Sequence, residues 1–147
     1  MGFVWIWLFP SRWKFARLTR AIEGLHQEVQ SVSADSDRLL QQAQSLTEEL
    51  PSLPGDELRA RVLALLQEAE GVAARHRRLT LEIQKMHSRT QRYFEQRYRA
   101  PVSPEVTEMF EGWTSRLDQQ QRQVLSLLEE LKQKDEAGNV RQESERG

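Results

Sequence analysis

Few side chains in this 147-residue chain could do chemistry, and the three histidines come first. Glu23 and His26 have the Glu-x-x-His spacing by which one helix supplies two ligands to a di-iron centre. Such a centre also needs a second copy of the motif and further facing glutamates. Neither His76 nor His87 has a glutamate three residues before it. We therefore predict no metal site and no cofactor.

The other common catalytic groups also lack their partners. The chain has no cysteine, which excludes thiolate metal sites and cysteine nucleophiles. Its seven glycines are scattered and form no phosphate-binding loop, and no serine is matched with a base. We expect a protein that is not an enzyme and has no catalytic residues.

The elements that position the side chains are predicted to be helices, because Gln, Glu, Arg, Leu and Ala dominate the chain. Two stretches interrupt this composition, LPSLPGDE at 50–57 and APVSPEV at 100–106, each with two prolines three residues apart. Proline removes a backbone donor and clashes with the preceding turn, so neither stretch fits inside a helix. We predict helices at 11–50, 56–99 and 104–136, with a disordered tail at 137–147.

Apolar residues recur in all three segments at alternating steps of three and four, the heptad spacing of a coiled-coil seam. Helices joined by short turns are usually antiparallel neighbours. The predicted fold is all-α, an antiparallel up-down-up three-helix coiled-coil bundle over 11–136, and the rival is an extended parallel oligomer with the prolines as kinks. The seam positions are Phe15, Leu18, Ile22, Leu25, Val29, Val32, Ser36, Leu39, Ala43, Leu46 and Leu50, then Leu58, Val62, Leu65, Ala69, Val72, His76, Leu79, Ile83, Met86, Thr90 and Tyr93, then Val106, Phe110, Trp113, Leu117, Gln120, Val124, Leu127 and Leu131.

Four of these seam positions are polar: Ser36, His76, Thr90 and Gln120. A polar residue in a seam fixes the register of the helices at a cost in stability, and we assign these four that role. In helix number and heptad use, the segment 11–136 resembles a spectrin-type repeat. Leu25 and His26 stand in the middle of the first helix, where such repeats carry a tryptophan.

The N-terminus begins with an apolar aromatic segment at 1–10 whose core is FVWIWLF. Crossing a bilayer takes about 20 apolar residues, so this segment is too short to span one. It has no preceding basic residue and no cleavage site, so it is not a secretory signal. Trp and Phe favour the membrane–water interface. The residues predicted to contact a membrane or a partner are Phe3, Val4, Trp5, Ile6, Trp7, Leu8, Phe9 and Trp13.

Basic residues should gather at the same end of the folded chain. In the up-down-up arrangement, one end (11–30, 75–99 and 104–128) carries a net charge of +6 and the other end −7. An apolar segment beside a basic patch is the pair of signals that peripheral membrane anchoring requires. We call the basic residues nearest the apolar segment the basic collar: Arg12, Lys14, Arg17, Arg20, Arg89 and Arg92.

The sequence predicts a non-enzymatic helical adaptor or spacer at the cytoplasmic face of a membrane, held by an anionic surface or a membrane complex. One alternative is an obligate subunit, soluble in the cytoplasm, whose N-terminus fills a groove of a partner; another is an N-terminus that caps its own bundle. Nucleic acid along the basic face, with Tyr93, Phe94 and Tyr98 as stacking partners, is less favoured. A protein partner is expected at the acidic hairpin 31–72, because the shorter third helix should leave part of the seam there uncovered. The Leu39-Leu40 and Leu65-Leu66 doublets widen the apolar stripe and suggest a homo-oligomer.

Overall fold

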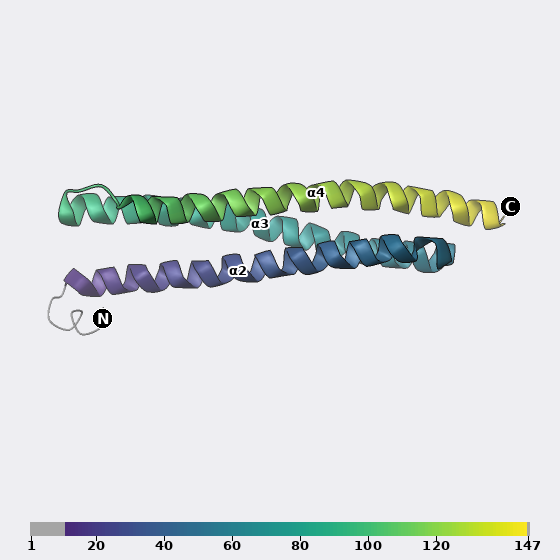
Figure 1. Cartoon of the computed structure of the whole chain (residues 1–147), viewed down its shortest axis with the longest axis horizontal. Coiled ribbons are helices and arrows are strands. Elements are labelled where there is room, and N and C mark those ends of the chain that lie inside the picture. Colours follow the sequence, from purple (N-terminus) through teal and green to yellow (C-terminus); the bar gives the residue numbers. More distant parts are fainter. Residues whose placement is uncertain (1–10, 147) are drawn as a thin grey trace. The chain divides into compact units, whose positions relative to one another are not determined.

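The computed structural model describes the backbone of residues 11–146 and the side chains of 14–134 and 136. It contains three long α-helices, α2 (Ser11–Glu49), α3 (Gly55–Tyr98) and α4 (Pro104–Arg146), with a 3-10 turn η1 (Leu50–Ser52) after α2 (Figure 1). The described residues contain no β-strand. The prediction of an all-α, three-helix bundle is confirmed at this level. The apolar segment 3–9 and the side chains of Arg12 and Trp13 lie outside the described residues.

The two proline-containing stretches end and restart the helices as predicted. Pro51 lies in η1, and the Pro54 carbonyl accepts the backbone N–H of Leu58 at 2.9 Å in the first turn of α3. The carbonyl of Ser103 accepts the N–H groups of Val106 and Thr107 at 3.2 and 3.3 Å at the start of α4.

The far end of α4 differs from the prediction. The helix continues to Arg146, whereas we expected it to end at 136 and a disordered tail to follow. The tail is rich in Glu, Gln and Arg, which are good helix formers. Their summed preference outweighs Gly138 and Asn139, the two residues on which the expectation of disorder rested.

Arg99 follows the last residue of α3 with a φ of 50°, in the left-handed region. Its N–H donates to the carbonyl of Glu95 at 3.0 Å, which closes the end of the helix. This conformation costs a residue with a Cβ about 1–2 kcal/mol, and glycine avoids that cost.

We expect Arg99→Gly to raise the free energy of unfolding by about 1 kcal/mol. Arg97→Gly, inside the last turn of α3, should lower it by about as much, because glycine is a poor helix former. Urea denaturation followed by circular dichroism measures both variants. Destabilisation by Arg99→Gly would show that the left-handed turn is not strained.

The chain forms two compact units, and each helix contributes a segment to both. Unit 1 comprises 11–31 and 79–115, and unit 2 comprises 32–78 and 116–146. Unit 2 holds a continuous apolar cluster in which aliphatic side chains from all three helices and from the turn pack together. The cluster consists of Leu39, Ala43, Leu46, Leu53, Leu58, Val62, Leu65, Ala69, Val72, Ala73, Val124, Leu127, Leu128 and Leu131.

This cluster changes the interpretation of the acidic hairpin. Leu46, Leu53 and Leu58, near the turn, are buried in the same cluster as Leu131 of α4. Leu40 and Leu66, the second members of the two leucine doublets, are partly buried against it. The doublets therefore complete the core of unit 2. A partner at 31–72 and a homo-oligomer stay predictions, without an uncovered seam to support them.

The core of unit 1 is aromatic where the three helices meet. Phe110 of α4 is 1% exposed, stacks on His87 of α3 at 5.1 Å and meets Trp113 edge-on at 5.4 Å. Trp113 in turn stacks on His26 of α2 at 5.1 Å. The predicted seam is thus largely buried, but Phe15 is 41% exposed and Ala16 is buried in its place.

Four buried polar side chains form a layer across unit 2. We call it the polar layer, and it consists of Ser33, Ser36, His76 and Gln120. The hydroxyl of Ser36 donates to the carbonyl of Val32 at 2.9 Å and lies 3.1 Å from Nε2 of His76. The tautomer of the His76 ring decides which of the two groups donates in this contact. Gln120 Nε2 donates to the hydroxyl of Ser33 at 2.8 Å. Three predicted polar seam positions, one from each helix, therefore occupy one layer.

Candidate functional site

A surface cleft of about 350 Å³ lies between α2 and α3 in unit 1, and we call it the basic cleft. Its lining combines cationic side chains with one amide, one phenol and one aliphatic side chain. The residues are Lys14, Arg17 and Leu18 from α2 and Arg89, Arg92, Tyr93 and Gln96 from α3.

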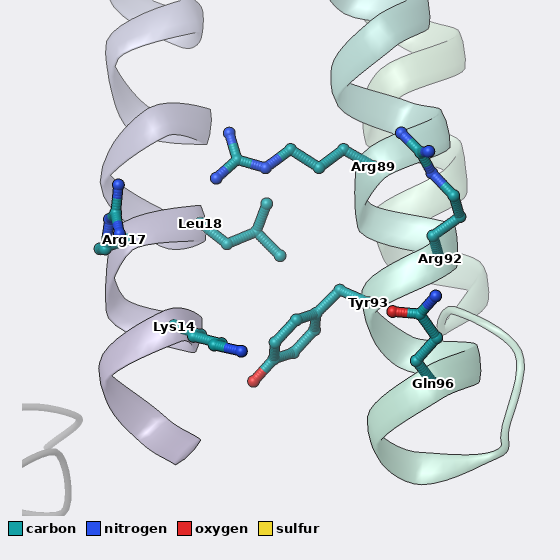
Figure 2. A pocket seen from close by; sticks show the side chains of 7 residues that line it. All are labelled: Lys14, Arg17, Leu18, Arg89, Arg92, Tyr93 and Gln96. Atoms are coloured by element: carbon teal, nitrogen blue, oxygen red, sulfur yellow. The ribbon is translucent and has the colours of Figure 1, made fainter. Parts of the chain in front are cut away.

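Helical spacing brings these residues to one side of each helix. Arg89, Arg92, Tyr93 and Gln96 follow steps of three, one and three, which place them along one face of α3. Figure 2 shows Arg89 extending from α3 toward α2 beside Leu18, and Lys14 extending from α2 toward the Tyr93 ring. Leu18 is 3% exposed and forms the apolar part of the lining.

No carboxylate lines the basic cleft. Among the described side chains, none of the Asp and Glu residues lies within salt-bridge distance of Lys14, Arg89 or Arg92. The first turn of α2 also contains no acidic residue. A helix N-terminus carries partial positive charge, so Lys14 near it adds like charge where an anion would be favourable.

A comparable cleft between α2 and α3 in unit 2 provides an internal comparison. It is lined by Arg38 and Arg75 together with Asp35 and Glu68. Arg38 pairs with Asp35 at 2.7 Å, and Arg75 forms an ion pair with the other oxygen of Asp35. The arginines of this second cleft are neutralised within the protein, whereas the lining of the basic cleft holds four cations and no acidic side chain.

An aromatic cluster adjoins the basic cleft and shares Tyr93 with it. The rings of Phe15 and Tyr93 lie 6.3 Å apart, and Phe94 and Tyr98 lie 5.7 and 6.1 Å from Tyr93. Phe15 and Tyr98 remain 41% and 52% exposed. Burial, followed by a hydrogen bond with Tyr98, raises the pKa of the Tyr93 hydroxyl. The phenol therefore keeps its proton at neutral pH.

The structure brings together four members of the predicted basic collar: Lys14, Arg17, Arg89 and Arg92. Arg20 is exposed but does not line the cleft, and the side chain of Arg12 is outside the described residues. Sequence reasoning did not find Gln96 or Leu18 as part of the site. The spacing of 89, 92, 93 and 96 on one helix was the available signal.

The net charges of the two units differ less than the net charges predicted for the two ends of the folded chain. Residues 11–31 and 79–115 contain nine Lys and Arg and seven Asp and Glu, against twelve and fifteen in 32–78 and 116–147. Arg75, Arg77 and Arg78 account for most of the change, because they belong to unit 2. Unit 1 as a whole is therefore only weakly basic, and four of its nine Lys and Arg residues line the cleft.

Comparisons with protein-family models, curated proteins and solved structures found no match to the chain. Within the described residues, no helix combines the length and apolar content needed to cross a membrane. The same part of the chain has no group of three His, Asp or Glu side chains placed to hold a metal ion. Of the Glu23 and His26 pair, His26 is engaged in stacking on Trp113.

Proposed function

We propose that the protein is a non-enzymatic helical adaptor or spacer that attaches to the cytoplasmic face of a membrane, or to a membrane complex, through its N-terminal end. The apolar segment 3–9 inserts at the interface, and the basic cleft meets anionic groups at the surface. The observation that supports this best is the joint presence, in unit 1, of four cations that line one cleft and of the exposed aromatic rings of Phe15 and Tyr98.

The up-down-up coiled coil is part of this proposal. In unit 2, Ser36 contacts His76 and Glu49 pairs with Arg61. Residues later in α2 therefore contact residues earlier in α3. Gln120 donates to Ser33, and Lys134 donates to Thr47 at 2.9 Å. Residues later in α2 therefore contact residues later in α4. These pairings support antiparallel α2 and α3, with α4 parallel to α2.

The energetics favour two weak signals acting together. A cation at an anionic surface contributes about 1 kcal/mol, and aromatic and aliphatic side chains add interfacial burial. Neither signal alone gives stable attachment, as with a single lipid anchor that binds reversibly. We therefore expect binding to depend on both the apolar segment and the charge of the membrane.

Co-sedimentation with vesicles tests the proposal. The full chain should sediment with phosphatidylserine-containing vesicles and stay in solution with phosphatidylcholine alone. Residues 11–147, checked for helix content by circular dichroism, should bind the anionic vesicles at least about tenfold more weakly, because the interfacial signal is gone. If both chains stay in the supernatant with anionic lipid, the membrane proposal is wrong. Capture of a membrane complex by the full chain but not by 11–147 would then favour the partner-groove alternative.

A further inference from the structure

The basic cleft has a chemistry more specific than attraction to a negative surface, and the inference drawn from it rests on the proposed function. Diffuse attraction needs only exposed cations, which the chain also has elsewhere: Arg77 and Arg78 of α3 are both exposed. The basic cleft differs because its donors come from two helices and surround one volume of about 350 Å³. That volume lies at the lower end of the range for small-ligand sites.

The donors suit a compact, highly charged anion. Arg89 and Arg92 each present a planar guanidinium that can donate two parallel hydrogen bonds to a pair of oxygens. Lys14 adds an ammonium and Gln96 an amide N–H₂. Together they match three equivalent oxygens bearing up to two charges better than one carboxylate oxygen pair bearing a single charge.

The second cleft shows that the fold allows arginines between α2 and α3 to be paired with a carboxylate. There, Asp35 pairs with both Arg38 and Arg75. In the basic cleft the corresponding counter-charge is absent from the lining, and Lys14, Arg89 and Arg92 have no carboxylate within salt-bridge distance among the described residues. Lys14, Arg89 and Arg92 line one cleft and repel one another, so a bound dianion would remove an unfavourable interaction as well as add hydrogen bonds.

We propose that the basic cleft binds a phosphomonoester dianion, presented by a lipid headgroup at the surface to which the protein attaches. A phosphomonoester carries between −1.5 and −2 charges near pH 7 and three acceptor oxygens. The phosphodiester of an ordinary phospholipid carries one charge and has fewer free oxygens. The cleft should therefore prefer phosphatidic acid to phosphatidylserine at equal surface charge.

The experiment compares two kinds of vesicle matched in surface charge by electrophoretic mobility. One contains phosphatidic acid, whose headgroup is a phosphomonoester, and the other contains phosphatidylserine. The full chain is tested beside the double variant Arg89→Gln with Arg92→Gln. The control is Arg77→Gln with Arg78→Gln, which removes the same charge from exposed positions of the same helix away from the cleft.

We expect the full chain to bind the phosphatidic acid vesicles more tightly. The cleft variant should lose about 25-fold in affinity for them, since each cation contributes about fivefold. The control should lose less than about threefold. Replacing both cleft arginines with lysine should restore only part of the binding, because lysine keeps the charge but not the bidentate geometry. Helix content by circular dichroism confirms that each variant is folded.

Glycerol 3-phosphate, measured by calorimetry without vesicles, distinguishes the two sources of the phosphate. Weak binding that is lost in the cleft variant, together with preference for phosphatidic acid vesicles, supports a lipid headgroup. Binding of glycerol 3-phosphate without any vesicle binding would overturn the lipid source.

Failure of this inference has a signature different from failure of the proposed function. Equal binding to both charge-matched vesicles, with equal losses in the cleft and control variants, would overturn the phosphomonoester site and leave membrane attachment intact. No binding to any anionic vesicle would overturn membrane attachment itself.

Discussion

Replacing Phe110 with alanine is expected to lower the free energy of unfolding by about 3–5 kcal/mol. Phe110 is 1% exposed and lies between His87 of α3 and Trp113 of α4 in the core of unit 1. Removing the ring deletes apolar burial, leaves a cavity and removes two ring contacts. Because a domain of this kind is stable by about 5–15 kcal/mol, the loss is a large fraction of the total.

Urea denaturation followed by circular dichroism measures this loss, with Leu81→Ala as the control. Leu81 belongs to the same unit but is 57% exposed, so its replacement should change stability by less than about 0.5 kcal/mol. Hydrogen exchange would show whether the loss of stability is confined to unit 1, as expected if the two units open separately. A Phe110→Ala variant as stable as the Leu81→Ala control would contradict the packing described for unit 1.

Acidification below pH 6.5 is expected to destabilise the protein through His76. This residue is 0% exposed, and burial, with a smaller opposing contribution from Gln120 and a further lowering by Arg75, lowers its pKa below 6.5. In the unfolded chain His76 takes up a proton near pH 6.5, while in the folded protein it stays neutral until the lower pKa is reached. The unfolded state then binds more protons, so stability falls as the pH falls through this interval.

The size of the effect follows from one proton. The free energy of unfolding should fall by up to about 1.4 kcal/mol per pH unit between pH 6.5 and the lowered pKa, and His76 should add nothing above pH 6.5. Geometry gives the same direction, since protonation of His76 would place a positive charge inside the buried polar layer. The charged residues adjacent in sequence to Ser36 and His76 are Asp35, Asp37, Arg75 and Arg77, and Asp35 forms an ion pair with Arg75.

The variant His76→Gln isolates this effect, because glutamine keeps hydrogen-bonding groups and does not titrate in this range. His26 and His87 are present in both proteins, so their contributions cancel in the difference. Urea midpoints measured from pH 8 to pH 5 should diverge on acidification, with the natural chain losing more stability. Parallel pH dependence in the two proteins would show that His76 is not buried in neutral form.

The sequence predicted the elements well because their signals are local. Two proline pairs placed the ends of α2 and α3 and the start of α4 within about a residue, and heptad spacing identified nearly all buried seam residues. The end of α4 was missed because no proline marks it, and good helix formers carry the helix past Gly138. Phe15 was placed in the seam by spacing, but Ala16 is buried there instead, since spacing alone does not say which of two adjacent residues faces inward.

The candidate site was only partly predictable. The collar residues could be named from sequence because they flank the ends of predicted helices. The sequence could not show whether these charges are neutralised, because that depends on which carboxylates lie across the basic cleft. Asp35 reaches Arg75 forty residues away, while no residue plays this part in the lining of the basic cleft. The role of Ser36, His76 and Gln120 was predicted one helix at a time, and their meeting in one layer required the structure.

The polar layer also limits how this fold can vary in length. An insertion of seven residues in α2 between Ser36 and the turn at Leu50–Ser52 preserves the heptad pattern but moves Ser36 by about 10 Å along its neighbour. Ser36 would then keep only its bond to the Val32 carbonyl in its own helix, and its contact with His76 would be lost. The insertion is tolerated only if α3 gains the same seven residues between Gly55 and His76. Homologues of different size should therefore gain or lose residues in equal blocks on both sides of the turn.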